Sequence, residues 1–302
     1  MQKVLVIIGP TGVGKTALSI QIAQHYQCPI ISADSRQIYK EIPIGTAAPT
    51  EQEQQSVKHY FIGNKSITEH YNAGQYERDC LQLLEQLNRE KNPIAVIVGG
   101  SMLYVDAVCK GVLDDIPTIN TTIKEQVKAL YQQHGLEFLQ KQVQQVDEAY
   151  WQQVDKNNPQ RLMHCLAVKM QTGKPLTSFW QQKKREEKFD FIKLGLQIPR
   201  EKLYEQINAR VDKMMEQGLL QEAEKMYPNK HLNALNTVGY KELFRYFDGE
   251  YTLEEAIEKI KQHSRHYAKR QMTWFRSDQT INWINKDEKY EEIIRFVDDL
   301  LR

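Results

Sequence analysis

Short apolar runs recur along the first third of the chain. Val4 to Ile8 is entirely apolar and ends at a glycine, a pattern typical of a central strand in a parallel sheet. Pro29 to Ser32 and Ile94 to Val98 have the same character. The stretches between them place apolar residues at helical spacing, as at Leu18, Ile22 and Ala23, and within residues 74–90 at Leu81, Leu84 and Leu87. This alternation predicts a doubly wound α/β core on a parallel sheet.

The pattern changes after about residue 113. From there to residue 180 no strand-like run occurs, glutamine becomes frequent, and apolar residues recur at helical spacing, as at Leu136, Leu139 and Val143. We interpret residues 113–180 as a helical insertion. It separates a first part of the core, residues 1–112, from the part that completes it, residues 181–302. The polar stretch 181–188 is interpreted as a solvated connection.

The completing part begins with a further strand-like run, Ile192 to Ile198. From Arg200 onward the apolar spacing predicts helices to the end of the chain, with helix ends at Gly218 and Gly249. The last long helix is expected over about Leu253 to Arg276. The chain is therefore predicted to combine an α/β core, a helical insertion domain and a helical C-terminal region.

The composition narrows the class of protein. The 302 residues contain 40 lysines and arginines against 39 acidic residues, which excludes a histone-like protein and an acidic tail. The four cysteines form no Cys-x-x-Cys pair, which excludes a disulfide scaffold and a short-spaced zinc site. No apolar run is long enough for a membrane span, and the N-terminus lacks the features of a signal peptide. We expect a cytoplasmic protein with no membrane partner.

The strongest chemical signal follows the first predicted strand. The segment Gly9-Pro-Thr-Gly-Val-Gly-Lys-Thr16 matches GxxxxGK[ST] between a strand and a helix, the arrangement of a nucleotide-binding P-loop. Its glycines let the backbone wrap around a phosphate, and its N–H groups point inward at the helix N-terminus. Lys15 supplies a positive charge, and the Thr16 hydroxyl can bind Mg²⁺. The predicted phosphate-binding residues are Gly9, Pro10, Thr11, Gly12, Val13, Gly14, Lys15 and Thr16.

Two further features indicate what this loop holds. In most P-loop nucleotide hydrolases a later strand ends in an aspartate that helps to hold Mg²⁺, but here Ile94 to Val98 runs into Gly99-Gly100-Ser101. Asp34 follows the second strand, and the carboxyl ends of parallel strands share one edge, so it should lie beside the phosphate loop. Asp34 could accept a proton from a nucleophile, or it could cap a helix. Spacing alone favours neither role.

The last long helix carries a second candidate surface. Between Lys261 and Ser277 it has basic residues and no acid, with two histidines and three aromatic residues among them: Lys261, His263, Arg265, His266, Tyr267, Lys269, Arg270, Trp274, Phe275 and Arg276. Basic and aromatic residues together fit the phosphates and bases of a nucleic acid. They also fit a surface helix whose aromatic residues belong to the core.

In this order the motifs resemble the tRNA dimethylallyltransferases. The matching blocks lie between residues 4 and 276 and are the phosphate loop, Ala33 to Tyr39, Val98 to Tyr104, Arg210 to Met214, Gly239 to Glu242 and Tyr267 to Arg276. The resemblance implies a P-loop NTPase-like core and transfer of the dimethylallyl group of dimethylallyl diphosphate to N6 of adenine 37 in the tRNA anticodon loop. The product would be N6-isopentenyladenosine. Mg²⁺ would be the cofactor, and the phosphate loop would hold the isoprenoid diphosphate.

The resemblance also implies roles for single residues. Asp34 would be the general base for N6, and Lys15 and Arg210 would stabilise the departing diphosphate. Ser101 would hydrogen-bond the reacting region, and Thr16 would be the metal ligand. The adenine must leave its stack to reach them. The residues expected to contact tRNA are Asp34, Ser35, Arg36, Gln37, Ser101, Lys124, Gln160, Arg161, Lys269 and Arg270, with Gln37 a candidate to read the adenine.

Four positions depart from the family pattern. Ser101 stands where threonine is usual and keeps the hydroxyl. Lys124 stands where an arginine is expected, which keeps the charge but not the bidentate fork. His164 and Ala167 stand where an arginine and a glutamate are expected. The basic patch of the insertion is therefore expected to bind tRNA less strongly than the patch that the family pattern has at this place.

Three other functions are compatible with parts of the pattern. A P-loop small-molecule kinase would share the loop and the acid after the second strand, but it would not need the basic helix. An isopentenyltransferase acting on free adenine nucleotides would not need the helical insertion. A non-catalytic RNA-binding module would not need Lys15, Thr16 and Asp34 together. We expect an enzyme that acts on tRNA as a monomer.

Overall fold

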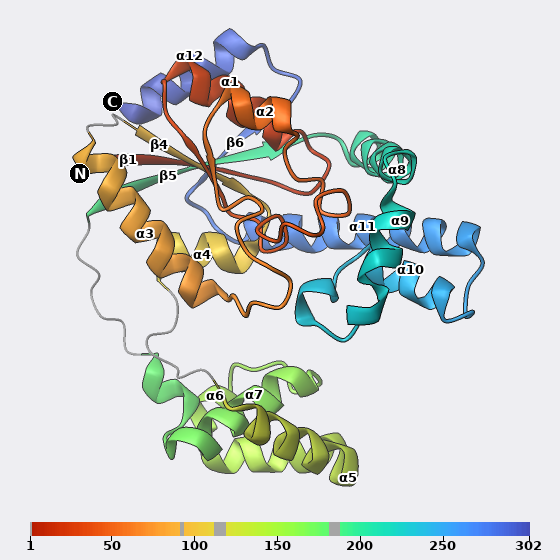
Figure 1. The fold of residues 1–302 in the computed structure, drawn as a ribbon. Coiled ribbons are helices and arrows are strands. Elements are labelled where there is room, and N and C mark those ends of the chain that lie inside the picture. The colour runs from red at the N-terminus through yellow and green to blue at the C-terminus, as the bar shows by residue number, and fades with distance from the viewer. Residues whose placement is uncertain (1, 91–93, 112–118, 181–187) are drawn as a thin grey trace. The chain divides into compact units, whose positions relative to one another are not determined.

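The computed structural model describes residues 2–90, 94–111, 119–180 and 188–302 (Figure 1). The chain divides into two compact units, residues 1–110 with 187–302, and residues 111–186. Each unit has a hydrophobic core of its own. The predicted insertion, residues 113–180, falls within the second unit. The predicted solvated connection, residues 181–188, lies outside the described residues except for its last residue.

A parallel sheet forms the centre of the first unit. In the described part of the chain it has six strands in the order β3-β2-β4-β1-β5-β6. They are β1 (Gln2–Ile8), β2 (Ile30–Ser32), β3 (His59–Tyr60), β4 (Ile94–Gly99), β5 (Phe189–Gln197) and β6 (Ile281–Asn285). Central β1 pairs with β4 and β5, and its residues Val4 to Ile8 have no exposed surface. Complete burial explains why the run from Val4 to Ile8 is uniformly apolar.

Helices cover both faces of this sheet (Figure 1). One face carries α1 (Lys15–His25) and α12 (Tyr290–Leu301), and the other carries α3 (Ala73–Arg89), α4 (Met102–Lys110) and α11 (Leu253–Arg276). The remaining helices of this unit are α2 (Glu51–Ser56), α8 (Arg200–Glu216), α9 (Leu219–Met226), α10 (Tyr240–Phe247) and the 3-10 turns η2 (Tyr227–Asn229) and η3 (Asn233–Leu235). The predicted α/β core, including the span of its last long helix, is confirmed.

One prediction for the C-terminal region is wrong. The segment after Arg200 was expected to be helical throughout, but Ile281–Asn285 forms strand β6 against β5. Its two buried apolar residues are Ile281 and Ile284. A run this short does not distinguish strand from helix by periodicity, so the neighbouring strand decides its conformation. Gly218 and Gly249 do follow the ends of α8 and α10, as predicted.

Among its described residues the second unit contains helices joined by turns and loops, and no strand. It contains α5 (Thr121–Val146), α6 (Glu148–Trp151), α7 (Pro159–Thr172) and the 3-10 turn η1 (Leu176–Phe179). Leu139 and Val143, which belong to the predicted apolar stripe, are fully buried in its core. The carboxylate of Asp147 accepts hydrogen bonds from the backbone N–H groups of Tyr150 and Thr177 and so joins α6 to η1. The predicted helical character is confirmed over residues 119–180.

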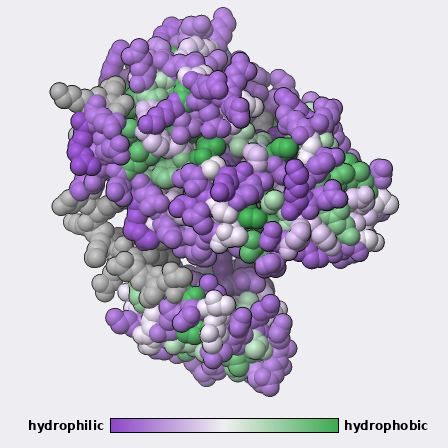
Figure 2. Space-filling view, viewed as in Figure 1, coloured by the Kyte–Doolittle hydropathy of each residue, from purple (hydrophilic) through white to green (hydrophobic). Residues whose placement is uncertain are grey.

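The surface is mainly hydrophilic on the face shown in Figure 2, where apolar side chains form only small patches. Among the described residues, no helix combines the length and the apolar character that a membrane span requires.

Candidate active site

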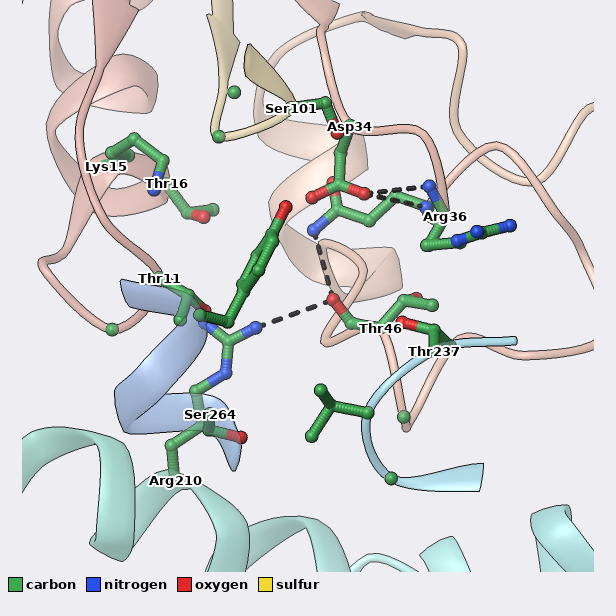
Figure 3. A pocket seen from close by; sticks show the side chains of 18 of the residues that line it. Thr11, Lys15, Thr16, Asp34, Arg36, Thr46, Ser101, Arg210, Thr237 and Ser264 are labelled. Atoms are coloured by element: carbon green, nitrogen blue, oxygen red, sulfur yellow. Dashed lines mark hydrogen bonds between the residues drawn. The ribbon is translucent and has the colours of Figure 1, made fainter. Parts of the chain in front are cut away.

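A cavity of about 540 Å³ lies at the carboxyl ends of the central strands (Figure 3). Segments that are far apart in the sequence line it: the phosphate loop after β1, the turn after β2, the loop after β4, helices α8 and α11, and residues 236–239. In Figure 3, Lys15 and Thr16 lie on one side of this cavity and Asp34 and Ser101 lie on the other. This is the edge at which parallel α/β sheets bind ligands.

The phosphate loop has the conformation that its sequence predicts. Gly14 is the N-cap of α1, with a φ of 97° that favours glycine, and no side chain caps the helix. The first N–H groups of α1 are therefore available to an anion. Five of the eight predicted loop residues line the cavity, namely Thr11, Gly12, Gly14, Lys15 and Thr16. The others shape the loop, with Val13 fully buried in the core.

Lys15 lies folded against its own loop. Its Nζ donates hydrogen bonds to the carbonyl oxygens of Gly9 at 3.0 Å and Pro10 at 2.8 Å. Burial lowers the pKa of Lys15 to about 7, helped by the nearby charge of Arg210 and opposed by that of Asp34. Near neutral pH the side chain can thus take up a proton when an anion enters.

Arg210 enters the cavity from α8 (Figure 3). Its Nη2 lies 3.5 Å from the carbonyl oxygen of Thr46, and burial lowers its pKa, although an arginine remains charged. Within the described residues, neither Arg210 nor Lys15 has a carboxylate at ion-pair distance. Two buried cations without an anionic partner make the cavity suited to a ligand with several negative charges.

The carboxylate of Asp34 is held by the turn that follows it. Its Oδ1 accepts hydrogen bonds from the backbone N–H groups of Arg36 at 2.8 Å and Gln37 at 3.3 Å (Figure 3). No helix follows Asp34, because residues 35–38 form a turn, so the expectation that it could cap a helix is wrong. Oδ1 holds this turn instead. In the described part of the chain, Oδ2 has no hydrogen-bond donor. The negative charge is close enough to raise the pKa of Lys15, so the structure brings Asp34 and the phosphate loop to one cavity.

Ser101 contacts the Asp34 turn rather than extending a free hydroxyl into the cavity. Its Oγ accepts a hydrogen bond from the backbone N–H of Ser35 at 2.8 Å and lies 3.1 Å from the Ser35 hydroxyl. Its own N–H donates to the carbonyl oxygen of Ala33 at 3.2 Å. These contacts connect Ser101 to Ala33 and Ser35, the two residues on either side of Asp34.

Gln37 is engaged by the protein itself. Its Nε2 donates to the carbonyl oxygens of Thr46 at 3.3 Å and Ala47 at 3.0 Å, and its Oε1 accepts from Ser32 at 3.3 Å. To read a base, this amide would have to exchange at least one of these bonds. The predicted tRNA contacts that line the cavity are Asp34, Ser35, Arg36, Gln37, Ser101 and Arg270.

The basic face of α11 is only partly available to a ligand. Lys261 forms ion pairs with Asp212 and Glu258, and Arg265 donates to Asn208 at 2.6 Å. Lys269 and Arg270 are exposed and have no carboxylate at ion-pair distance among the described residues. The three aromatic residues divide between surface and interior: Tyr267 lines the cavity, Trp274 is 38% exposed and Phe275 is buried.

Three predicted tRNA contacts belong to the second unit. Lys124 on α5 and Gln160 and Arg161 on α7 are all exposed. Partial burial and, second, the charge of Lys124 lower the pKa of His164. The lowered pKa favours the neutral form of this histidine, whereas Lys124 and Arg161 carry a positive charge.

Sequence reasoning missed Glu222 of α9. This buried carboxylate accepts hydrogen bonds from the backbone N–H groups of Ile44 at 2.9 Å and Gly45 at 2.8 Å, and from the hydroxyl of Tyr240. It fixes the loop whose Thr46 carbonyl contacts Arg210. An acidic residue on the apolar side of a helix, next to Leu219 and Ala223, was the signal that could have found it.

Mg²⁺ is implied by the family resemblance, and the residues present fit one ion carried by a diphosphate. Thr16 lines the cavity, and no hydrogen bond to its hydroxyl is found among the described residues. The described residues contain no cluster of three or more histidine, cysteine or acidic side chains that could hold a metal by itself. Mg²⁺ commonly binds through few protein ligands together with substrate phosphates, so a single hydroxyl is sufficient.

Comparison with known proteins identifies the family. Residues 37–278 match the model of the IPP transferase family. The chain is 49% identical over 288 residues to tRNA dimethylallyltransferase 2 of Parabacteroides distasonis, covering 95% of this chain and 96% of the relative. It is 46% identical over 308 residues to the tRNA dimethylallyltransferase of Flavobacterium johnsoniae, covering 100% of this chain and 99% of that relative.

Solved structures agree with these matches. The tRNA isopentenylpyrophosphate transferase of Bacillus halodurans has a TM-score of 0.73 and 33% identity, covering 100% of this chain and 97% of that chain. A eukaryotic dimethylallyltransferase acting on tRNA has a TM-score of 0.83 and 27% identity, covering 100% of this chain and 80% of that chain. The main prediction from the sequence is confirmed, and the kinase and free-nucleotide alternatives are not supported. By sequence and by fold, this chain belongs to the IPP transferase family of tRNA dimethylallyltransferases.

Proposed function

We propose that this enzyme transfers the dimethylallyl group of dimethylallyl diphosphate to N6 of adenine 37 in the tRNA anticodon loop. The observation that carries the proposal is the cavity in which the phosphate loop with Lys15, together with Arg210 of α8, faces the carboxylate of Asp34. The new bond joins N6 to C1 of the isoprenoid, and the bond between C1 and the diphosphate oxygen breaks. Its electron pair leaves with the diphosphate, and the N6 proton passes to Asp34.

Asp34 is suited to this proton transfer. The exocyclic amine of adenine is a weak nucleophile, because its lone pair is delocalised into the ring. A base that removes its proton as the new bond forms lowers the barrier. Oδ1 is fixed by the N–H groups of Arg36 and Gln37, which leaves Oδ2 to accept the proton.

The opposite side of the cavity is suited to the leaving group. Negative charge grows on the diphosphate oxygens as the allylic carbon departs. The phosphate loop, Lys15 and Arg210 line this side, and the loop N–H groups and the two basic side chains would stabilise that charge. Mg²⁺, held by Thr16 and the diphosphate itself, would add positive charge at the same place when bound.

The acceptor is proposed to reach this cavity as an extruded base. A base in a stacked loop cannot enter a partly enclosed cavity of this kind, so it must be flipped out. Arg36, Gln37 and Arg270 line the cavity and would contact the anticodon loop there. Lys124, Gln160, Arg161 and Lys269 would contact the tRNA backbone. We propose that the enzyme is a monomer and that it works in the cytoplasm, where its tRNA substrate is found.

The test uses the purified chain with Mg²⁺, dimethylallyl diphosphate and unmodified tRNA, followed by mass spectrometry of the nucleosides. A five-carbon mass gain on adenosine in tRNA, absent when adenine 37 is replaced by guanine, is expected. AMP in place of tRNA should give no product, and geranyl diphosphate should replace the donor poorly. Gain on AMP, or no gain on either acceptor, would contradict the proposal. Light scattering of the same sample gives the molar mass in solution and so tests whether the enzyme is a monomer.

A further inference from the structure

Gln271 links the two halves of the cavity. This residue of α11 is 2% exposed, and both polar atoms of its side chain are used. Its Oε1 accepts a hydrogen bond from the backbone N–H of Thr11 at 2.8 Å, and its Nε2 donates to the carbonyl oxygen of Gly100 at 2.8 Å. Thr11 belongs to the phosphate loop after β1, and Gly100 to the loop after the neighbouring strand β4. One buried amide therefore joins two loops on adjacent strands.

The fit around this amide is close. A Cβ at position 100 would lie 2.4 Å from Nε2 of Gln271, so the amide occupies the space that a side chain would take. Both polar atoms of this buried amide are hydrogen-bonded to backbone groups. The side chain therefore holds its two partners, Thr11 and Gly100, at a fixed separation. Neither a carboxylate nor an apolar side chain reproduces both bonds.

From Gly100 the contacts continue to the proposed base. The next residue, Ser101, accepts from the backbone N–H of Ser35 at 2.8 Å, and Ser35 follows Asp34 directly. On the other side, Thr11 lies in the loop that ends at Lys15. A continuous set of hydrogen bonds and short backbone segments thus runs from the phosphate loop through Gln271 to the Asp34 turn.

We propose that Gln271 is a positioning residue that sets the separation between the diphosphate-binding loop and Asp34. This rests on the proposed function, in which a donor on one loop must meet an acceptor held by the other. It gives α11 a second role beside its exposed basic residues. Both polar atoms of Gln271 are engaged by the protein itself, so its effect should appear in the rate of transfer more than in binding.

The first test replaces the amide with an apolar side chain of similar length. Gln271→Met should lower kcat by about 100-fold, the effect of a displacement of roughly 1 Å between reacting groups. The affinities for dimethylallyl diphosphate and tRNA, measured separately, should change by less than about threefold. The matched control is Gln262→Met on the same helix, where the side chain is partly exposed and, among the described residues, accepts only from Lys259. It should leave all three quantities unchanged.

The second test uses pH. In Gln271→Glu an ionised carboxylate still accepts from Thr11 but cannot donate to Gly100, whereas the protonated acid can do both. Its rate relative to that of the unaltered enzyme should therefore rise as the pH is lowered from 8 to 6. Burial raises the pKa of such a carboxyl group, which brings its titration into this range. A substitution that merely loosens the fold would not be rescued by acid.

A third readout does not depend on activity. Hydrogen exchange at the Thr11 amide should be faster in Gln271→Met than in the unaltered enzyme, by at least about tenfold, because its acceptor is lost. Unchanged exchange would overturn the inference, as would an unchanged kcat or a loss of diphosphate affinity as large as the loss of kcat. If the unaltered enzyme transfers no isoprenoid, the proposed function fails, and the exchange result still decides whether Gln271 holds the two loops.

Discussion

The phosphate loop and the Asp34 turn face each other across one cavity, but they are built in different ways. The phosphate loop is a single segment whose glycines and helix N-terminus determine its shape. The Asp34 turn depends on distant residues: Ser101 fixes Ser35, Glu222 fixes the loop before Thr46, and Gln271 joins the two sides. The comparison teaches that the phosphate loop itself is encoded locally, although Arg210 joins it from α8, whereas the Asp34 turn is assembled by the fold. Changes in the first should act on binding, and changes in the second on turnover.

The largest effect is expected when the proposed base at Asp34 is removed while the turn that it holds is kept. In Asp34→Asn the side-chain oxygen can still accept from Arg36 and Gln37, but it can no longer take up the N6 proton. We expect kcat to fall by about 10²- to 10⁴-fold, the usual contribution of a general base, with tRNA affinity nearly unchanged. Asp34→Ala, which also loses the turn, should be no faster. Single-turnover assays measure both, and a near-native rate in Asp34→Asn would exclude the base role.

Lys15 tests the phosphate loop. Lys15→Ala should weaken binding of dimethylallyl diphosphate by about 10- to 100-fold, because a charge-assisted contact in a dry site is lost. The pKa of Lys15 is about 7 in the empty cavity, so above pH 7 the neutral amine must gain a proton before it pairs with the ligand. Affinity should therefore fall as pH rises from 7 to 9, by up to about tenfold per unit, and the variant should lack this dependence.

Calorimetry checks this prediction through the same proton. At pH 8.5 the binding enthalpy of the unaltered enzyme should vary with the ionisation enthalpy of the buffer, since the complex takes up a proton. The slope should be absent in Lys15→Ala. A flat pH profile in the unaltered enzyme would mean that Lys15 stays charged in the empty site.

Glu222 tests whether the Asp34 turn really depends on distant support. Glu222→Gln replaces one acceptor oxygen by a donor, which leaves one of three N–H or O–H groups without a partner. We expect a loss of about 1–3 kcal/mol in the free energy of unfolding and about a tenfold lower kcat, with diphosphate affinity retained. The control is Glu224→Gln, an exposed neighbour on the same helix. Urea denaturation and steady-state kinetics separate the two effects, and equal behaviour of both variants would refute the role.

The smallest effect is expected on the surface of α11. Replacing Lys269 and Arg270 together by alanine should weaken tRNA binding several-fold and reduce the slope of log K against log salt by about 1 per lost phosphate contact. Arg265 is omitted, because it is engaged by Asn208. The control replaces Lys289 and Arg295 by alanine, which removes the same charge. Lys289 precedes α12 and Arg295 lies within it, on the opposite face of the sheet (Figure 1). An unchanged slope would leave α11 as scaffold.

The fold was predicted correctly where the pattern of apolar residues is long or is marked by a motif. The buried run Val4 to Ile8, the helix after the phosphate loop and the span Leu253–Arg276 were all readable, because complete burial or helical periodicity imposes a recognisable composition. Strand β6 was not, since five residues carry too little periodicity and its conformation follows from pairing with β5. A local sequence pattern does not predict an element such as β6, whose stability comes from pairing with a neighbouring strand.

The sequence by itself determined the phosphate loop, the α/β core, the helical insertion and the family of the chain. Each is written in contiguous residues whose backbone preferences or burial patterns act locally. Only the tertiary structure decided how Ser101, Glu222 and Gln271 are used, and which basic residues of α11 remain available. These roles depend on hydrogen bonds between residues up to 260 positions apart, as from Thr11 to Gln271. Such bonds form only when the chain folds, because until then the amide or carboxylate is hydrogen-bonded to water and its protein partner is distant.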